Sequence, residues 1–146
     1  MPRTVRVPET LKASPFTLAQ AREIGLSPRT LHGRCYRRLC QGIYLPADVD
    51  LCPSVWLAAA TLRMPVGSAV SGLWAAREWG VDLLPADAQV VEITLPRGHP
   101  MRRGSGILAR RASLTPNGVV RLDGIPGTSE VRTAFDSPDA SRARTP

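Results

Sequence analysis

Long hydrophobic runs are missing from this chain of 146 residues. No stretch is apolar over the length that a helix needs to cross a bilayer, which excludes a membrane-spanning helix from our prediction. The basic N-terminus is followed by no apolar segment, so we expect no secretory signal peptide. The sequence therefore predicts a protein without a membrane partner.

Cysteine is scarce and odd in number, since the chain has only Cys35, Cys40 and Cys52. An odd count without a secretion signal favours a reducing compartment, so we expect a cytoplasmic protein without a disulfide framework. Together with His32 these cysteines match no familiar zinc-ligand spacing, and we predict no metal and no cofactor. We interpret Cys35 as a small apolar residue on the buried face of a helix.

Familiar catalytic signatures are also missing. The glycines fit neither a P-loop nor a dinucleotide-binding fingerprint. Three serines lack a nucleophile elbow, namely Ser68, Ser71 and Ser129. Glu92, Glu130 and Asp136 would suit a metal-dependent nuclease only as a cluster, but Glu92 lies on the polar face of a predicted strand, where solvated carboxylates are ordinary. We therefore predict no catalytic residues and no enzyme.

Positive charge is abundant, and nearly all of it is arginine. The chain has 19 Lys and Arg residues against 12 acidic residues, a net charge of +7, and Lys12 is its single lysine. This balance indicates a polyanionic partner. GC-rich coding sequence is an alternative explanation, but clustering in the sequence favours a binding face. The clustered residues are Arg29, Arg34, Arg37 and Arg38, then Arg97, Arg102, Arg103, Arg110 and Arg111.

Residues 14–47 have the pattern of two short helices, a tight turn and a β-hairpin. Thr17 and Gln20 are spaced as a capping box, which satisfies two free N–H groups at a helix start. Gly25 suits the end of that helix, and Pro28 suits the first position of the next. A helix, a Gly-containing turn and a helix form the outline of a helix-turn-helix, whose second helix usually enters the DNA major groove.

The second helix has side chains suited to DNA. A helical wheel from Pro28 to Arg37 places Leu31 and Cys35 on the buried face and arginines on the other. Arginine contacts phosphates or donates two hydrogen bonds to guanine, and threonine reaches a base edge. The apolar residues around the Gln41-Gly42 turn predict a hairpin that would form a wing against the DNA backbone. The predicted DNA contacts are Ser27, Arg29, Thr30, Gly33, Arg34, Arg37 and Arg38.

Two further interpretations apply to this region. Helical hairpins with arginines on their solvent face are common, so spacing alone leaves both DNA binding and an ordinary solvated surface open. Gly33 either allows close approach to the groove or weakens the helix, because glycine costs about 1 kcal/mol in a helix interior.

The remaining chain predicts an α+β fold. We expect an apolar, buried helix after Pro53 and a second helix over 67–79, with the three tryptophans as core anchors. Strands are predicted at 90–95, 107–109 and 119–122, in a small antiparallel sheet. The predicted organisation is a flexible N-terminus at 1–13, a winged helix-turn-helix at 14–47, an α+β module at 51–136 and a disordered tail at 137–146.

A basic, Gly- and Pro-rich loop at 96–106 joins the first two of these strands. Arg97, Arg102 and Arg103 are candidate phosphate contacts in it, and an ordinary solvated connection is the alternative. His99 has no evident partner, so we assign it no role.

The order of the motifs resembles a known family. The pattern F-T-x-x-Q-A-x-x-x-G-L-S-x-x-x-L from Phe16 to Leu31, followed by R-R-L-x-x-G-I-Y from Arg37 to Tyr44, resembles the N-terminal domain of AbiEi-type antitoxins and of actinobacterial winged-helix regulators. Three later segments are similar to pieces of the same family: GSAVSGLWAAREWGV at 67–81, VEITLPRGHPMRRGSGILARRASL at 91–114 and GIPGTSEVRTAFD at 124–136. The resemblance covers about residues 14–136.

This resemblance implies a winged-helix protein that binds double-stranded DNA and represses its own gene. An alternative is a protein-interaction role, because antitoxins of the family oppose a nucleotidyltransferase-like toxin with their C-terminal part. A third is the front of a nuclease, since longer relatives continue into an endonuclease-like domain. No residues here match that domain, and the tail after 136 has no apolar periodicity. A natural short form and a truncated or frameshifted product both stay open, and the absence of heptads leaves the oligomeric state undetermined.

Overall fold

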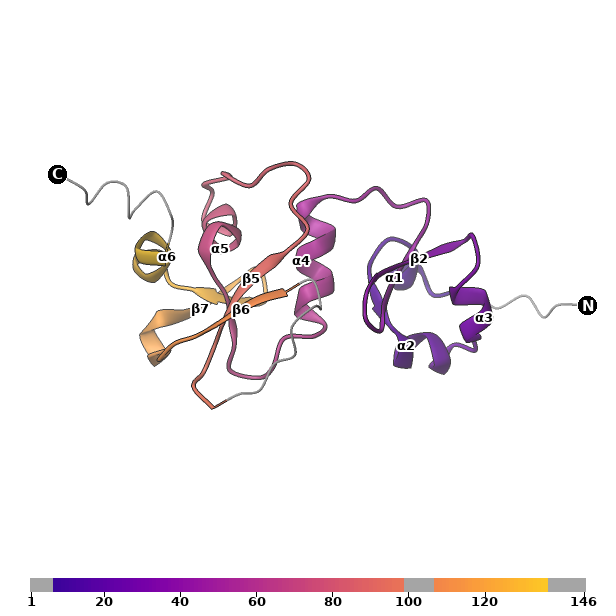
Figure 1. Cartoon of the computed structure of the whole chain (residues 1–146), viewed down its shortest axis with the longest axis horizontal. Coiled ribbons are helices and arrows are strands. Elements are labelled where there is room, and N and C mark those ends of the chain that lie inside the picture. The colour runs from indigo at the N-terminus through magenta and orange to yellow at the C-terminus, as the bar shows by residue number, and fades with distance from the viewer. Residues whose placement is uncertain (1–6, 99–106, 137–146) are drawn as a thin grey trace, which may run out of the picture. The chain divides into compact units, whose positions relative to one another are not determined.

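The computed structural model describes residues 7–98 and 107–136 of the chain (Figure 1). The chain divides into two compact units, Met1–Leu62 and Arg63–Pro146. Each unit contains both helices and strands, so the predicted α+β class is confirmed. The expected tail at 137–146 lies outside the described residues.

The first unit consists of short elements connected by tight turns. In chain order they are α1 (Glu9–Lys12), β1 (Phe16–Thr17), α2 (Leu18–Glu23), α3 (Pro28–Leu31), β2 (Tyr36–Cys40), β3 (Ile43–Pro46) and α4 (Pro53–Thr61). The three strands form an antiparallel sheet in the order β1-β3-β2. The predicted hairpin is therefore confirmed, and Gly42 adopts a φ of +76° in its turn, a conformation that glycine adopts without strain.

Local side-chain bonds explain where the helices of the first unit begin. The Thr17 hydroxyl accepts a hydrogen bond from the Gln20 backbone N–H at 3.1 Å, and the Gln20 side chain accepts one from the Thr17 N–H at 2.9 Å. This reciprocal pair confirms the predicted capping box. Ser27 caps α3 in the same way, by accepting from the Thr30 N–H at 3.2 Å. Gly25 follows α2 with a φ of +86°, as expected for a helix end.

Aromatic rings form the centre of the first unit. Phe16 is fully buried, and its ring centroid lies 5.8 Å from that of Tyr36, edge-on, and 6.4 Å from that of Tyr44, nearly parallel. Both distances are within the usual range for aromatic pairs. Leu26 and Leu31 are buried in the same core, so the loop after α2 and the buried side of α3 are fixed against it.

The second unit is a five-stranded sheet with helices. Its elements are β4 (Ala69–Val70), α5 (Gly72–Glu78), β5 (Val91–Leu95), β6 (Ile107–Arg111), a 3-10 turn (Pro116–Gly118), β7 (Val119–Leu122), β8 (Ile125–Thr128) and α6 (Glu130–Asp136). The strand order is β6-β5-β4-β8-β7. The α5 helix packs against β5 and α6 (Figure 1).

This sheet is mixed, so the prediction of an antiparallel sheet is wrong. β5 runs parallel to β6, and β4 pairs with β8 in parallel at Val70 and Gly127, whereas the other pairs are antiparallel. Parallel neighbours cannot be joined by a tight hairpin turn, and in the sequence the segment 96–106 separates β5 from β6. Strand patterns in the sequence do not encode strand direction.

The predicted helix over 67–79 is wrong at its start. Ala69 and Val70 form strand β4, because their backbone pairs with β5 and β8, and the helix begins only at Gly72. Gly72 has a φ of +63°, and a Cβ there would overlap the carboxylate of Glu92. Glycine is therefore favoured at this turn from strand to helix, because its backbone conformation is strained for other residues.

The three tryptophans differ in burial. Trp74 is 2 % exposed and belongs to the core, as predicted. Trp79 is 39 % exposed, so its prediction as a core anchor is wrong, although its indole N–H donates to the Thr128 carbonyl at 3.0 Å. Trp56 on α4 is half-buried, and full burial of this helix is confirmed only for Leu57, Ala59 and Ala60.

Candidate nucleic-acid interface

The second helix of the predicted motif is much shorter than expected. α3 is one turn that ends at Leu31, and His32 caps it in right-handed helical geometry. The Gly33 N–H donates to the Thr30 carbonyl at 3.1 Å, which closes a turn instead of continuing the helix. The helical wheel from Pro28 to Arg37 is therefore wrong beyond its first turn, because the chain must turn through 32–35 to enter β2. Glycine at position 33 favours this ending.

Cys35 is exposed, so the prediction that it packs on a buried helix face is wrong. The physical reason is the early end of α3, which leaves Cys35 in a turn before β2. Its carbonyl accepts a hydrogen bond from the Ala47 N–H at 2.9 Å, so its backbone closes the end of the hairpin.

Three of the predicted DNA-contacting arginines project from the first unit. Arg29 lies on α3, Arg34 in the turn after it and Arg38 in β2, and all three are exposed. Together they place positive charge on the second helix, on the following turn and on the hairpin. This is the arrangement that a duplex would meet if α3 faced a groove and the hairpin faced the backbone.

Arg37 lies in β2, so its predicted position on the helix is wrong. It pairs with Leu45 across the hairpin, is half-buried, and donates from Nη2 to the Ala47 carbonyl at 2.6 Å. This bond fixes the chain that leaves β3, and it occupies the guanidinium group inside the protein. The geometry gives Arg37 a structural role.

The two predicted hydroxyl contacts are exposed but engaged. The Ser27 Oγ and Thr30 Oγ1 atoms lie 2.9 Å apart, within hydrogen-bond distance, and the Ser27 Oγ also caps α3. Gly33 is exposed and adds no side chain to this surface. Any further exposed side chain that could contact DNA beside Arg29 must therefore lie at the end of α3.

His32 is such a side chain, and it is not among the predicted DNA contacts. It is exposed, and its ring lies edge-on to the ring of Tyr44, with centroids 6.4 Å apart and planes at 83°. A sequence signal existed, because His32 follows Arg29 by three positions, the spacing of neighbours on a helix.

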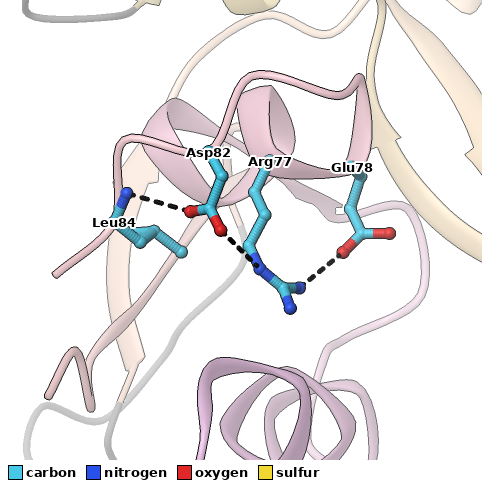
Figure 2. A network of polar contacts seen from close by, with 4 residues as sticks. All are labelled: Arg77, Glu78, Asp82 and Leu84. Carbon is cyan, nitrogen blue, oxygen red and sulfur yellow. Dashed lines mark hydrogen bonds and ion pairs between the residues drawn. The ribbon is translucent and has the colours of Figure 1, made fainter. Parts of the chain in front are cut away.

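In the second unit, one arginine is held by acidic neighbours (Figure 2). Arg77 on α5 has its Nη1 atom 3.2 Å from the Glu78 Oε1 atom and its Nε atom 3.8 Å from the Asp82 Oδ2 atom. The other oxygen of Asp82 accepts a hydrogen bond from the Leu84 N–H at 3.2 Å. This network fixes the chain after α5 and offsets the charge of Arg77, so Arg77 is a poor candidate for a phosphate contact.

Other cations of the second unit lie at one end of a strand pair. Arg110 on β6 is paired with Thr94 of β5, and Arg97 follows the end of β5 by two residues. Because β5 and β6 are parallel, both arginines lie toward the carboxyl ends of these strands, and both are exposed. The other candidates in this stretch, Arg102 and Arg103, lie outside the described residues, as does His99.

Among the described residues, no group of three His, Cys, Asp or Glu side chains could hold a metal ion. Glu92 is half-buried against Gly72, where the sequence predicted a solvated carboxylate. Within residues 7–98 and 107–136, no helix is long and apolar enough to cross a bilayer.

Comparison with known proteins adds no relative. No known protein family matches the sequence, and no curated protein matches it. The likeness to AbiEi-type antitoxins therefore depends on the order of the motifs alone.

Proposed function

We propose that this chain is a DNA-binding transcriptional regulator that resembles an AbiEi-type antitoxin and represses its own gene, with its first unit acting as a winged helix-turn-helix. The observation that supports this best is the order of elements. A helix, a strand, two helices and a hairpin follow one another from α1 to β3, and β1 pairs with β3. This is the order of a winged helix, in which the second of the paired helices faces DNA and the hairpin is the wing.

The placement of charge supports the same function. Arg29 lies on α3, and we propose that it donates to a base edge in the major groove. Arg34 and Arg38 flank it on the turn and the wing, where phosphate contacts are expected. Arg97 and Arg110 would add phosphate contacts from the second unit. The net charge of +7 favours such contacts over the whole chain.

The test is binding to duplex DNA by fluorescence anisotropy over a salt series. One duplex is the DNA upstream of the chain's own gene, and the other has random sequence. We expect tighter binding to the upstream duplex and a steep loss of affinity with salt, because phosphate contacts release counterions.

The double variant Arg29→Ala with Arg34→Ala should lose most of the preference for the upstream duplex. Arg121→Ala is the matched control, because Arg121 is exposed and donates to the Gly124 carbonyl within its own turn, at 3.0 Å. Unchanged affinity of the double variant would show that α3 is not the DNA-contacting helix, and no binding at low salt would refute DNA binding altogether.

A protein partner is the second candidate, and exposed apolar side chains of the second unit favour it. Val131 on α6 is 80 % exposed, and Val81, Leu83 and Val90 are each about half exposed. Exposed apolar side chains mark protein interfaces where they form a contiguous patch. The family resemblance suggests a nucleotidyltransferase-like toxin as the partner. Such a protein, if encoded beside this gene, should co-purify with the wild-type chain and bind Val131→Asp more weakly.

A further inference from the structure

We infer that His32 contacts DNA bases beside Arg29 and that the two side chains together determine the preferred sequence. This inference rests on the proposed function, because it deepens the role of α3 in it. It begins from the length of α3, which is a single turn. A helix this short presents few side chains to a groove, and those at its end matter more than in a long recognition helix.

The backbone brings His32 next to Arg29. His32 has φ −86° and ψ 0°, so it continues the helical path by one residue beyond Leu31. Residues three apart on a helix are neighbours, with Cβ atoms roughly 5–6 Å apart. Leu31, between them in sequence, points into the core and is 2 % exposed. Arg29 and His32 are therefore the exposed pair on the outer side of this turn.

The ring of His32 is held by the core. It lies edge-on to Tyr44, which is 6 % exposed and is stacked on the fully buried ring of Phe16. The four rings form one continuous row, from half-buried Tyr36 through the buried rings of Phe16 and Tyr44 to exposed His32. A side chain fixed in this way loses less conformational freedom on binding, which favours its use in recognition.

The residues next to His32 do not compete with its imidazole nitrogens for a base. Thr30, the other candidate for a base contact on this turn, has its hydroxyl 2.9 Å from the Ser27 hydroxyl. Gly33 follows His32 and has no side chain that would keep a duplex away. A neutral imidazole has one donor and one acceptor nitrogen. Beside an arginine that pairs with guanine, it suits an adjacent base with a major-groove donor or acceptor.

The experiment measures sequence preference, defined as the ratio of the affinities for the upstream duplex and a random duplex. We expect His32→Ala to reduce this ratio about tenfold, within the range for losing one base contact. The salt dependence should stay unchanged, whereas loss of a phosphate contact would lower its slope by about 0.9. His32→Gln should retain part of the preference, because an amide also donates and accepts. His99→Ala is the matched control, since His99 is the only other histidine of the chain.

A second measurement does not depend on a folded His32 variant. The imidazole proton resonances of the two histidines can be assigned from His99→Ala, and the wild-type chain is then titrated with the upstream duplex. The His32 resonance should shift on saturation. An unmoved His32 resonance, or an equal loss of affinity for both duplexes in His32→Ala, would overturn the inference while leaving the proposed function intact. Absence of any DNA binding by the wild-type chain would overturn both.

Discussion

The two units of this protein use their polar side chains over different distances. In the first unit the helix caps join residues three apart, as in Thr17 with Gln20 and Ser27 with Thr30. In the second unit the Trp79 indole reaches Thr128, 49 residues along the chain. In the first unit, the side-chain bond from Arg37 to Ala47 spans ten residues, and Arg29, Arg34 and Arg38 are exposed. The number of arginines in a unit therefore does not indicate a binding face. An arginine that acidic neighbours engage, as Glu78 and Asp82 engage Arg77, is a poor candidate for such a face.

The largest effect should come from Gly72→Ala in the second unit. The substitution adds strain at a φ of +63° and a clash with the Glu92 carboxylate, so we expect a loss of about 3 kcal/mol in the free energy of unfolding. Urea unfolding followed by circular dichroism measures it, and amide hydrogen exchange assigns the loss to one unit. Gly80→Ala is the control, because it has the same left-handed backbone with nothing within 4 Å of a new Cβ, and it should cost about 1 kcal/mol. Equal losses in both variants would show that Glu92 does not constrain Gly72.

A smaller loss is expected for Thr133→Val, which tests a buried hydrogen bond of the second unit. The Thr133 hydroxyl is buried, lies 2.6 Å from the Thr128 hydroxyl and donates to the Thr128 carbonyl at 3.0 Å. Removing it takes away the bond to the buried Thr128 hydroxyl, at a cost of about 2 kcal/mol, whereas the Thr128 carbonyl keeps its bond from the Trp79 indole. Val131→Ala on the same helix should be nearly neutral, because Val131 is 80 % exposed. The melting temperatures of the two variants measure these losses, and equal values would contradict a stabilising role of the Thr133 bond.

Thr17→Ala tests the local bonds of the first unit. It removes the capping box at the start of α2 and should cost about 1 kcal/mol. Thr17→Ser keeps the hydroxyl and should retain most of the stability. Hydrogen exchange should report the loss in Met1–Leu62 and not in Arg63–Pro146. A loss shared by both units would mean that the two units unfold together.

The smallest effect on stability is expected for Arg29→Ala. Arg29 is exposed, and substitutions at such surface positions usually change stability by less than about 0.5 kcal/mol. The same variant should weaken binding to the upstream duplex. Arg77→Ala should behave in the opposite way, with DNA binding kept and a modest loss of stability from its ion pairs with Glu78 and Asp82. Thermal melts and anisotropy on the same samples separate the two cases, and a reversed pattern would break the comparison between the units.

Sequence reasoning succeeded where the signal was local. The capping box at Thr17 and the turn at Gly42 each depend on a few consecutive residues, and both were predicted. It failed where contacts with residues distant in the sequence determine the secondary structure. β4 forms because Ala69 and Val70 pair with strands far along the chain, which outweighs their place in a helix-like pattern.

The candidate site was predicted in part for the same reason. Arg29, Arg34 and Arg38 were predicted as candidate contacts, and all three are exposed. Arg37 was misplaced on the helix, because the wheel assumed that α3 continues through Gly33. The bond from Arg37 to the Ala47 carbonyl depends on the hairpin folding back, which no periodicity in the sequence encodes.

The arginines at the edges of the five-stranded sheet affect how readily the protein aggregates. β6 and β7 are the outermost strands of the five-stranded sheet, and Arg110 and Arg111 on β6 and Arg121 on β7 are exposed. Outer strands are the places where a sheet can recruit strands from other molecules, and positive charge there opposes such pairing by mutual repulsion. Without these charges, exposed Leu108 on β6 would favour such association. These charges therefore act as a barrier against sheet-to-sheet aggregation when the protein is concentrated.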